Sequence, residues 1–177
     1  MFEYLQLAII WLGRRVWFSL PLITTLATLI VFMAPADLFG SAVPPPDIAL
    51  VSVFFWAIYG PSFLPPWSVF VLGLAQDVAT GAPIGFWAVI YLAAYGFAMS
   101  QRVFFIGRSG WGVVFGFAVV AFLTAAVAWI LGSVTYGRWL PSGPLFLQAL
   151  MSLVLYIPAS KVFGVMRRWL TNAREAI

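Results

Sequence analysis

Two long runs without a charged residue dominate this chain. Residues 48–76 and residues 78–101 contain no Asp, Glu, Lys or Arg, and only Asp77 separates them. A helix needs about 20 apolar residues to cross the hydrocarbon core of a bilayer, which is roughly 30 Å thick. Only 8% of the 177 residues are charged, whereas a soluble domain carries about 25%. The runs therefore predict an all-α integral membrane protein.

The residue types that are missing limit the possible chemistry. The chain contains no cysteine and no histidine, which removes disulfides, thiolate nucleophiles, imidazole bases and the commonest metal ligands. A catalytic acid–base pair would have to come from Asp37, Asp47 and Asp77. We therefore expect no enzyme, no metal and no cofactor. The net charge of +4 is spread over short segments, so we also expect no nucleic-acid partner.

The apolar runs predict a six-helix bundle that forms a single transmembrane domain over residues 1–177. As one helix, the run 48–76 would be about 43 Å long, and prolines interrupt it at Gly60-Pro61 and Pro65-Pro66. Because proline breaks a helix interior, we divide this run into a hairpin of two helices. The expected helices are Val16–Ala36, Pro46–Tyr59, Trp67–Thr80, Ala82–Gln101, Trp111–Gly132 and Leu145–Ser160.

The charges of the loops favour this division, because cytoplasmic loops of membrane proteins carry an excess of Lys and Arg. With six helices and a cytoplasmic N-terminus, eight of the nine basic residues lie in the cytoplasm and only Arg138 lies outside. If 48–76 formed one span, six of the nine would lie outside. We therefore expect both termini in the cytoplasm and residues 38–46 and 133–143 outside.

Both ends of the chain suggest contact with the membrane surface. Residues 1–13 are apolar and aromatic with one acid, which is typical of an interfacial helix. Arg14 and Arg15 precede an apolar run, as in a signal peptide, but this run exceeds the usual length of about 7–15 residues. We expect a retained span. The basic tail 161–177 is either a topology anchor or a docking surface for anionic lipid or a cytoplasmic partner.

Two acids stand at equivalent places around the divided run. Asp47 follows three prolines and opens a helix, so it suits an N-cap, where the helix dipole favours its charge. Asp77 closes the next helix, where the dipole disfavours an anion. It either reaches the headgroup layer or forms a polar site at the mouth of the bundle. Trp56 lies about two to three turns below Asp47 and is a pocket candidate.

Glycines crowd around Asp77. Gly73 and Gly81 flank the acid and permit close approach of helices. Gly81 and Gly85 can adopt backbone angles that other residues avoid, so together with Pro83 they predict a tight turn. We hypothesise that Asp77 accepts hydrogen bonds from backbone N–H groups of this turn, or from a group on a partner protein.

The order and spacing of these residues resemble the MreD family of bacterial rod shape-determining membrane proteins. The family pattern is a Pro-Asp pair that opens an apolar helix with an internal Trp, then Gly-Leu-x-x-Asp and Gly-x-Pro-x-Gly. In this sequence the pattern is carried by Pro46, Asp47, Trp56, Gly73, Leu74, Asp77, Gly81, Pro83 and Gly85. The turn PSFLPP between the two helices is less typical of the family.

The resemblance implies a non-enzymatic component of the peptidoglycan elongation machinery in the bacterial inner membrane. The implied partners are MreC most directly, the actin-like MreB, the polymerase RodA and a class B penicillin-binding transpeptidase in the same complex, and membrane lipids. The implied fold is similar to the six-helix substrate-capture subunits (S-components) of energy-coupling-factor transporters. An alternative therefore stays open, a subunit that binds or transports a small molecule or a lipid-linked substrate. A transporter usually needs a polar site at the membrane midplane.

Overall fold

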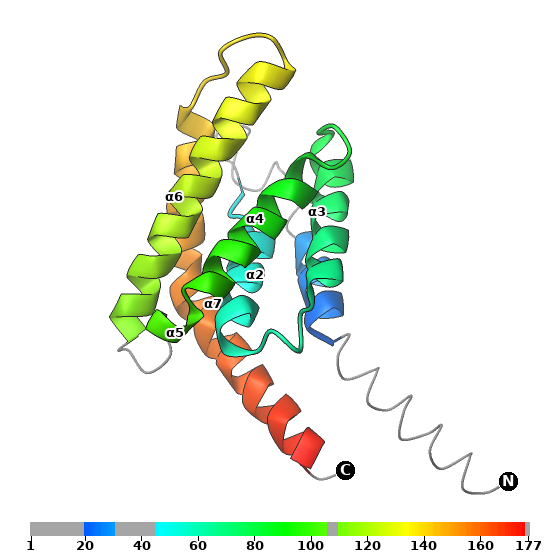
Figure 1. Ribbon diagram of the computed structural model, residues 1–177, viewed down its shortest axis with the longest axis vertical. Coiled ribbons are helices and arrows are strands. Elements are labelled where there is room, and N and C mark those ends of the chain that lie inside the picture. Colours follow the sequence, from blue (N-terminus) through cyan, green and yellow to red (C-terminus); the bar gives the residue numbers. More distant parts are fainter. Residues whose placement is uncertain (1–19, 31–44, 106–109, 176–177) are drawn as a thin grey trace, which may run out of the picture.

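The computed structural model describes residues 20–30, 45–105 and 110–175, and every regular element in these residues is a helix (Figure 1). The all-helical prediction is confirmed for this part of the chain. The predicted interfacial segment 1–13 lies outside it, and so do residues 38–44 of the predicted loop 38–46. The helices are Leu20–Ile30, α2 (Ile48–Tyr59), α3 (Pro66–Thr80), α4 (Phe86–Ser100), α5 (Arg102–Phe105), α6 (Gly110–Thr135) and α7 (Gly143–Glu175).

The short helix α2 forms the centre of the bundle. Every residue from Ile48 to Ile58 is buried, and α4 and α7 are the helices that pack most closely on it. Its sequence is apolar on all sides, which is typical of a helix that has no face exposed to water. On the remaining side, the hydroxyls of Thr25 and Ser52 are 2.6 Å apart, which ties the helix Leu20–Ile30 to α2.

The uncharged run 48–76 is divided into two helices. α2 ends at Tyr59 and α3 begins at Pro66, and the Phe63 N–H donates to the Gly60 carbonyl within the turn between them (2.9 Å). Pro66 suits the first helical position, where no backbone N–H is needed. However, α3 packs chiefly on α4 and only slightly on α2. The closely packed neighbours are α3 with α4 and α6 with α7.

Among the described residues, two helices are long and apolar enough to cross a membrane on their own, Gly110–Thr135 and Gly143–Asn172. The helices α2, α3 and α4 have 12, 15 and 15 residues. At 1.5 Å per residue they are about 18–23 Å long, shorter than the roughly 30 Å hydrocarbon core. The helix lengths therefore do not confirm six full spans.

The last helix extends well beyond its predicted end at Ser160. α7 has 33 residues, includes Pro158 and continues to Glu175, so most of the predicted basic tail is helical. The added segment contains three arginines, Arg167, Arg168 and Arg174, and arginine favours helix. The charge of Lys161 marks a change in the helix's surroundings and not the end of the helix.

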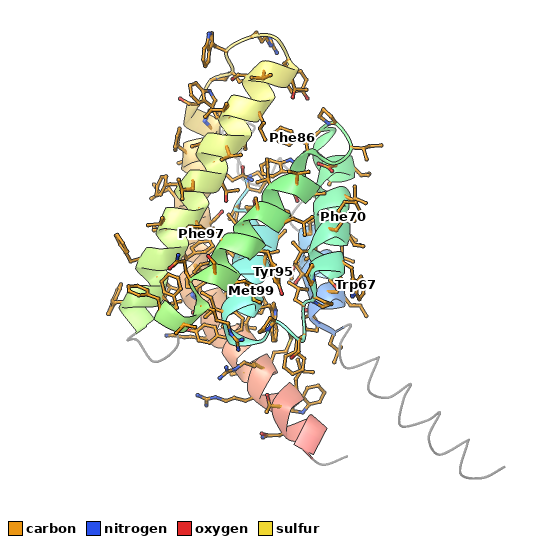
Figure 2. The ribbon with its side chains drawn as sticks, viewed as in Figure 1. Trp67, Phe70, Phe86, Tyr95, Phe97 and Met99 are labelled. Carbon is orange, nitrogen blue, oxygen red and sulfur yellow. The ribbon has the colours of Figure 1, made fainter. Side chains whose placement is uncertain are left out.

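Large apolar side chains cover much of the outer surface. Trp67 and Phe70 lie on the outer side of α3 (Figure 2) and are 60% and 43% exposed. On α6, Trp111 and Phe115 are more exposed still. Soluble proteins rarely expose a continuous apolar surface of this kind. The outer surface is therefore suited to contact with lipid.

The loops divide between two ends of the bundle. The turn between α3 and α4 and the loop between α6 and α7 lie at one end, and the turn between α2 and α3, α5 and the C-terminal part of α7 lie towards the other (Figure 1). We call this second end the arginine end. Here Arg102 Nε donates to the Ile58 carbonyl (2.8 Å) and Arg167 Nη1 to the Tyr59 carbonyl (3.2 Å). Both arginines satisfy carbonyls at the C-terminus of α2 and complement its dipole.

Candidate functional site

The carboxylate of Asp77 joins α3 to α4. The side chain is only 1% exposed. Its Oδ2 accepts a hydrogen bond from the Gly85 N–H and its Oδ1 accepts one from the Trp87 N–H, each at 2.7 Å. These two N–H groups lie at the start of α4, where a helix leaves its first donors without internal partners. Asp77 therefore caps α4, although it belongs to α3.

This arrangement resolves the unfavourable position that the sequence indicates for Asp77. The residue is near the C-terminus of α3, but its carboxylate lies at the N-terminus of α4, where the helix dipole favours an anion. The hypothesis that Asp77 accepts hydrogen bonds from the backbone of the glycine turn is confirmed at Gly85. Both carboxylate oxygens are already occupied by the chain's own N–H groups.

The glycines of the turn are needed for their backbone angles. Gly81 ends α3 with φ +66° and Gly85 precedes α4 with φ +96°, angles that residues with a Cβ rarely adopt. A Cβ at either position would meet no atom within 4 Å, so the predicted role of Gly81 in close helix approach is wrong. Between them, the Pro83 carbonyl accepts a hydrogen bond from the Phe86 N–H (3.0 Å).

Gly73, in contrast, does permit close approach of two helices. A Cβ on Gly73 would lie 2.2 Å from Ala88 Cα and 2.6 Å from its backbone nitrogen. No real Cβ comes so near a backbone atom, so any larger residue would push α3 and α4 apart. Together, Gly73, Asp77, Gly81, Pro83 and Gly85 build a single joint between these two helices, which we call the α3–α4 joint.

Asp47 holds a second buried polar cluster. Its Oδ1 accepts a hydrogen bond from the Leu50 N–H (2.8 Å), which confirms the predicted N-cap of α2. The same oxygen accepts a hydrogen bond from the Tyr91 hydroxyl (2.8 Å). The Asp47 N–H donates to Ser152 Oγ (2.7 Å), and this hydroxyl donates to the Gln148 carbonyl (2.7 Å). The cluster therefore links α2 to α4 and α7.

The space beside Asp47 is small. The two cavities that Asp47 lines have volumes of about 20 and 30 Å³. A water molecule needs at least about 10–15 Å³ of such volume, so each cavity has room for little more than one or two waters. The geometry around Asp47 is that of a cap and not that of a small-molecule site.

Trp56 is a core residue, and its interpretation as a pocket candidate is wrong. Its side chain is fully buried, and its ring packs against the rings of Phe55, Phe63 and Phe163 at centroid distances of 5.4–6.3 Å. Other aromatic rings of the core enclose the Trp56 ring, which explains the outcome. Trp56 lines none of the cavities described for Asp47.

Three residues of the polar clusters were not predicted from the sequence: Tyr91, Ser152 and Tyr156. Tyr91 and Ser152 contact Asp47 from 44 and 105 residues away along the chain, and no local pattern marks such partners. Tyr156 lines a cavity of about 440 Å³ at the arginine end, between α2, α6 and α7. The basic residues of the predicted tail were the one available signal for this cavity.

Comparison with known families decides the identity of the chain. A family model described as rod shape-determining protein MreD matches residues 13–166. The chain belongs to the MreD family. The match extends from before the first described helix into α7, and it confirms the resemblance noted for the residues around Asp47 and Asp77. No curated protein and no solved structure matches the chain significantly.

Membership of the MreD family makes this chain a rod shape-determining membrane protein. MreD is a family of shape-determining proteins and not a known enzyme family. In this MreD chain, the residues of the family pattern build the α3–α4 joint, the cap of α2 and the core. The two acids, Trp56 and the three glycines of the pattern therefore have structural roles.

Proposed function

We propose that this MreD-family chain is a non-enzymatic scaffold of the cell-elongation complex in the bacterial inner membrane. It binds MreC most directly and shares the complex with MreB, RodA and a class B penicillin-binding transpeptidase. The observation that carries the proposal is the family match over residues 13–166. The structure supports it indirectly, because Asp47 and Asp77 both act as helix caps.

We further propose six membrane-spanning segments with both termini in the cytoplasm. The two-ended arrangement supports this topology: Arg102 and Arg167 bind the same end of α2, and Lys161 and Arg168 line a cavity together with Arg167. Arg138 follows α6 at the opposite end. An excess of cations at one end is typical of the cytoplasmic side.

The alternative is a subunit that captures a small molecule. The surroundings of Asp47 and Asp77 give it less support. A small-molecule site usually encloses about 300–1,000 Å³, and the cavities at Asp47 are at least about tenfold smaller than the lower limit of this range. Both oxygens of Asp77 are engaged by backbone N–H groups. A scaffold needs no such cavity.

Co-purification from native membranes tests the proposed function. The full chain, carrying an affinity tag at its C-terminus, is isolated in mild detergent and its partners are identified by mass spectrometry. An unrelated multi-pass protein with the same tag is the control. We expect enrichment of MreC above the control, and loss of rod shape when the untagged chain is depleted. Absence of MreC together with normal rod shape after depletion would contradict the proposal.

A further inference from the structure

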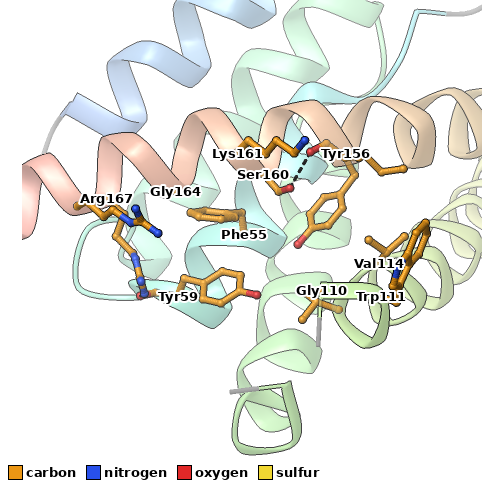
Figure 3. Close-up of a pocket in the computed structure, with 13 residues that line it drawn as sticks. Phe55, Tyr59, Gly110, Trp111, Val114, Tyr156, Ser160, Lys161, Gly164 and Arg167 are labelled. Atoms are coloured by element: carbon orange, nitrogen blue, oxygen red, sulfur yellow. Dashed lines mark hydrogen bonds between the residues drawn. The ribbon is translucent and has the colours of Figure 1, made fainter. Parts of the chain in front are cut away.

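A cavity with a polar lining lies between α2, α6 and α7 at the arginine end (Figure 3). It encloses about 440 Å³, enough for a headgroup or another small polar group. α6 and α7 are also the two helices long enough to cross a membrane. The cavity therefore lies where two membrane helices meet the basic end of the bundle.

The cavity is positively charged. Lys161, Arg167 and Arg168 line it, and none of the described residues that line it is acidic. Arg167 is held in place, because its guanidinium donates to the Tyr59 carbonyl (3.2 Å) and lies 5.4 Å from the centroid of the Tyr59 ring. Lys161 and Arg168 are exposed and free to adjust. This arrangement favours an anion with several acceptor oxygens.

The hydroxyl of Tyr156 is an independent indication of a binding site. Its side chain is 2% exposed, yet its hydroxyl has no hydrogen-bond partner among the described residues. The ring is fixed by stacking on Phe117 (4.4 Å between centroids, 11° between planes) and by an edge contact with Phe54 (5.7 Å). Buried hydroxyls are nearly always hydrogen-bonded. In Figure 3 the hydroxyl ends of Tyr156 and Tyr59 both point into the cavity.

The remaining walls are apolar. Phe55, Val114 and Ile157 line the cavity, and so does Trp111, which is mostly exposed on the outer face of α6. Apolar walls that continue onto a lipid-facing surface suit the acyl part of an amphiphile. A soluble anion would use only the charged half of such a cavity.

We propose that this cavity binds the phosphate headgroup of an anionic membrane phospholipid. The Tyr156 hydroxyl donates to a phosphate oxygen, and Lys161, Arg167 and Arg168 balance the negative charge. The acyl chains lie along Trp111 and Ile157. Basic cavities between membrane helices on the cytoplasmic side are common sites for anionic headgroups. The site requires the chain in a membrane but no partner protein, so it stands apart from the proposed scaffold function.

Lipid titration of the purified full chain tests this site. The chain in detergent is titrated with phosphatidylglycerol, or with phosphatidylcholine that carries the same acyl chains, and bound lipid is counted by native mass spectrometry. We expect phosphatidylglycerol to bind at least about tenfold more tightly. Tyr156→Phe removes only the hydroxyl and should weaken this binding about tenfold, the effect of one hydrogen bond to a charged group.

Matched variants separate the cavity from general charge effects. The double variant Lys161→Gln/Arg168→Gln changes exposed side chains, so it should fold normally, weaken binding at least about tenfold and reduce its salt dependence. Tyr136→Phe and Arg138→Gln, at the opposite end of α6, should leave binding unchanged. Circular dichroism melting confirms folding of each variant.

Three outcomes would overturn the proposal. Equal binding of the two lipids would remove the selectivity for anionic headgroups. Unchanged binding by Tyr156→Phe would place the lipid on the outer basic surface and not in the cavity. Displacement of the lipid by millimolar inorganic phosphate would identify the ligand as a soluble phosphate.

Discussion

Asp77 Oδ1 lies 2.7 Å from the backbone nitrogen of Trp87, ten residues further along the chain and in a different helix. The acid thus belongs to one helix and caps the next. With the parallel contact to Gly85, it satisfies two donors at the start of α4. The most buried carboxylate described in this chain therefore holds two helices in a fixed orientation.

The first prediction concerns the cap at Asp77. Asp77→Ala leaves the part-buried N–H of Gly85 and the buried N–H of Trp87 without partners. A buried donor that loses its partner costs about 1–3 kcal/mol. Asp77→Asn keeps one acceptor, so it should destabilise the protein less than Asp77→Ala. Thr80→Ala, an exposed site on the same helix, is the control and should have little effect. Thermal melting of the purified protein in detergent gives the order of stability of the three variants.

The same contacts predict how these variants behave in the cell. Because both oxygens of Asp77 are occupied within the chain, MreC recovered per folded molecule should equal that of the unmodified chain, while the amount of folded protein falls. A lower MreC yield per folded molecule of Asp77→Asn would show that the carboxylate acts on a partner.

Local contacts were predictable from the sequence, and distant ones were not. The cap of Asp47 reaches Leu50, three residues away, and the turn after Asp77 closes within ten residues. Such contacts depend on residue type and spacing along the chain. The hydroxyl of Tyr91 meets Asp47 across 44 residues because α4 packs on α2. Packing of this kind is decided by the whole bundle, and no motif records it.

The ends of the helices and their surroundings were also only partly predictable from the sequence. The dipole of α3 disfavours a charge at Asp77, but the turn brings the N-terminus of α4 beside this residue, and its dipole favours the charge. The break at prolines was predictable because proline acts on the backbone locally. The continuation of α7 to Glu175 was not, because the change from apolar to basic residues reports the surroundings of a helix and not its length.

The second prediction concerns the close approach of α3 and α4. Gly73→Ala places a Cβ 2.2 Å from Ala88 Cα, which forces the helices apart and should cost about 1–3 kcal/mol. Gly96→Ala is the matched control: it lies on α4, is exposed and has nothing within 4 Å of the added Cβ. It should stabilise the helix by up to about 1 kcal/mol. Opposite shifts in melting temperature are expected, and equal shifts would contradict the close approach.

The third prediction distinguishes two possible reasons for a glycine at Gly81, its backbone angle and the lack of room for a side chain. A side chain there meets no atom within 4 Å, but the backbone has φ +66°. Asn adopts this region several-fold more readily than most residues, and a β-branched residue rarely does. Gly81→Asn should therefore melt close to the unmodified protein, whereas Gly81→Val should lose about 1–3 kcal/mol. If both variants were equally unstable, crowding and not backbone angle would explain the glycine.

The fourth prediction concerns the buried cluster at Asp47. Tyr91→Phe removes one hydrogen bond to the carboxylate and should cost about 1.5–3 kcal/mol. Tyr136→Phe, at an exposed hydroxyl, is the control. A double-mutant cycle with Asp47→Asn measures the coupling directly, because the loss from Tyr91→Phe should shrink once the charge is gone. Full additivity of the two changes would argue against the contact.

The last prediction tests the proposed topology, and the cysteine-free sequence makes it direct. Ser142 precedes α7 in the loop that joins it to α6, and Asn172 lies near the other end of α7, in its basic part. A single cysteine at Ser142 should react with a membrane-impermeant thiol reagent in cells whose outer membrane has been permeabilised. A cysteine at Asn172 should react only after the inner membrane is broken. Equal abundance of the two variants, measured by immunoblot, is the control. If the cysteine at Asn172 reacted in intact spheroplasts and the one at Ser142 did not, the arginine end would lie outside. The excess of cations there would then not follow the rule on which the topology rests.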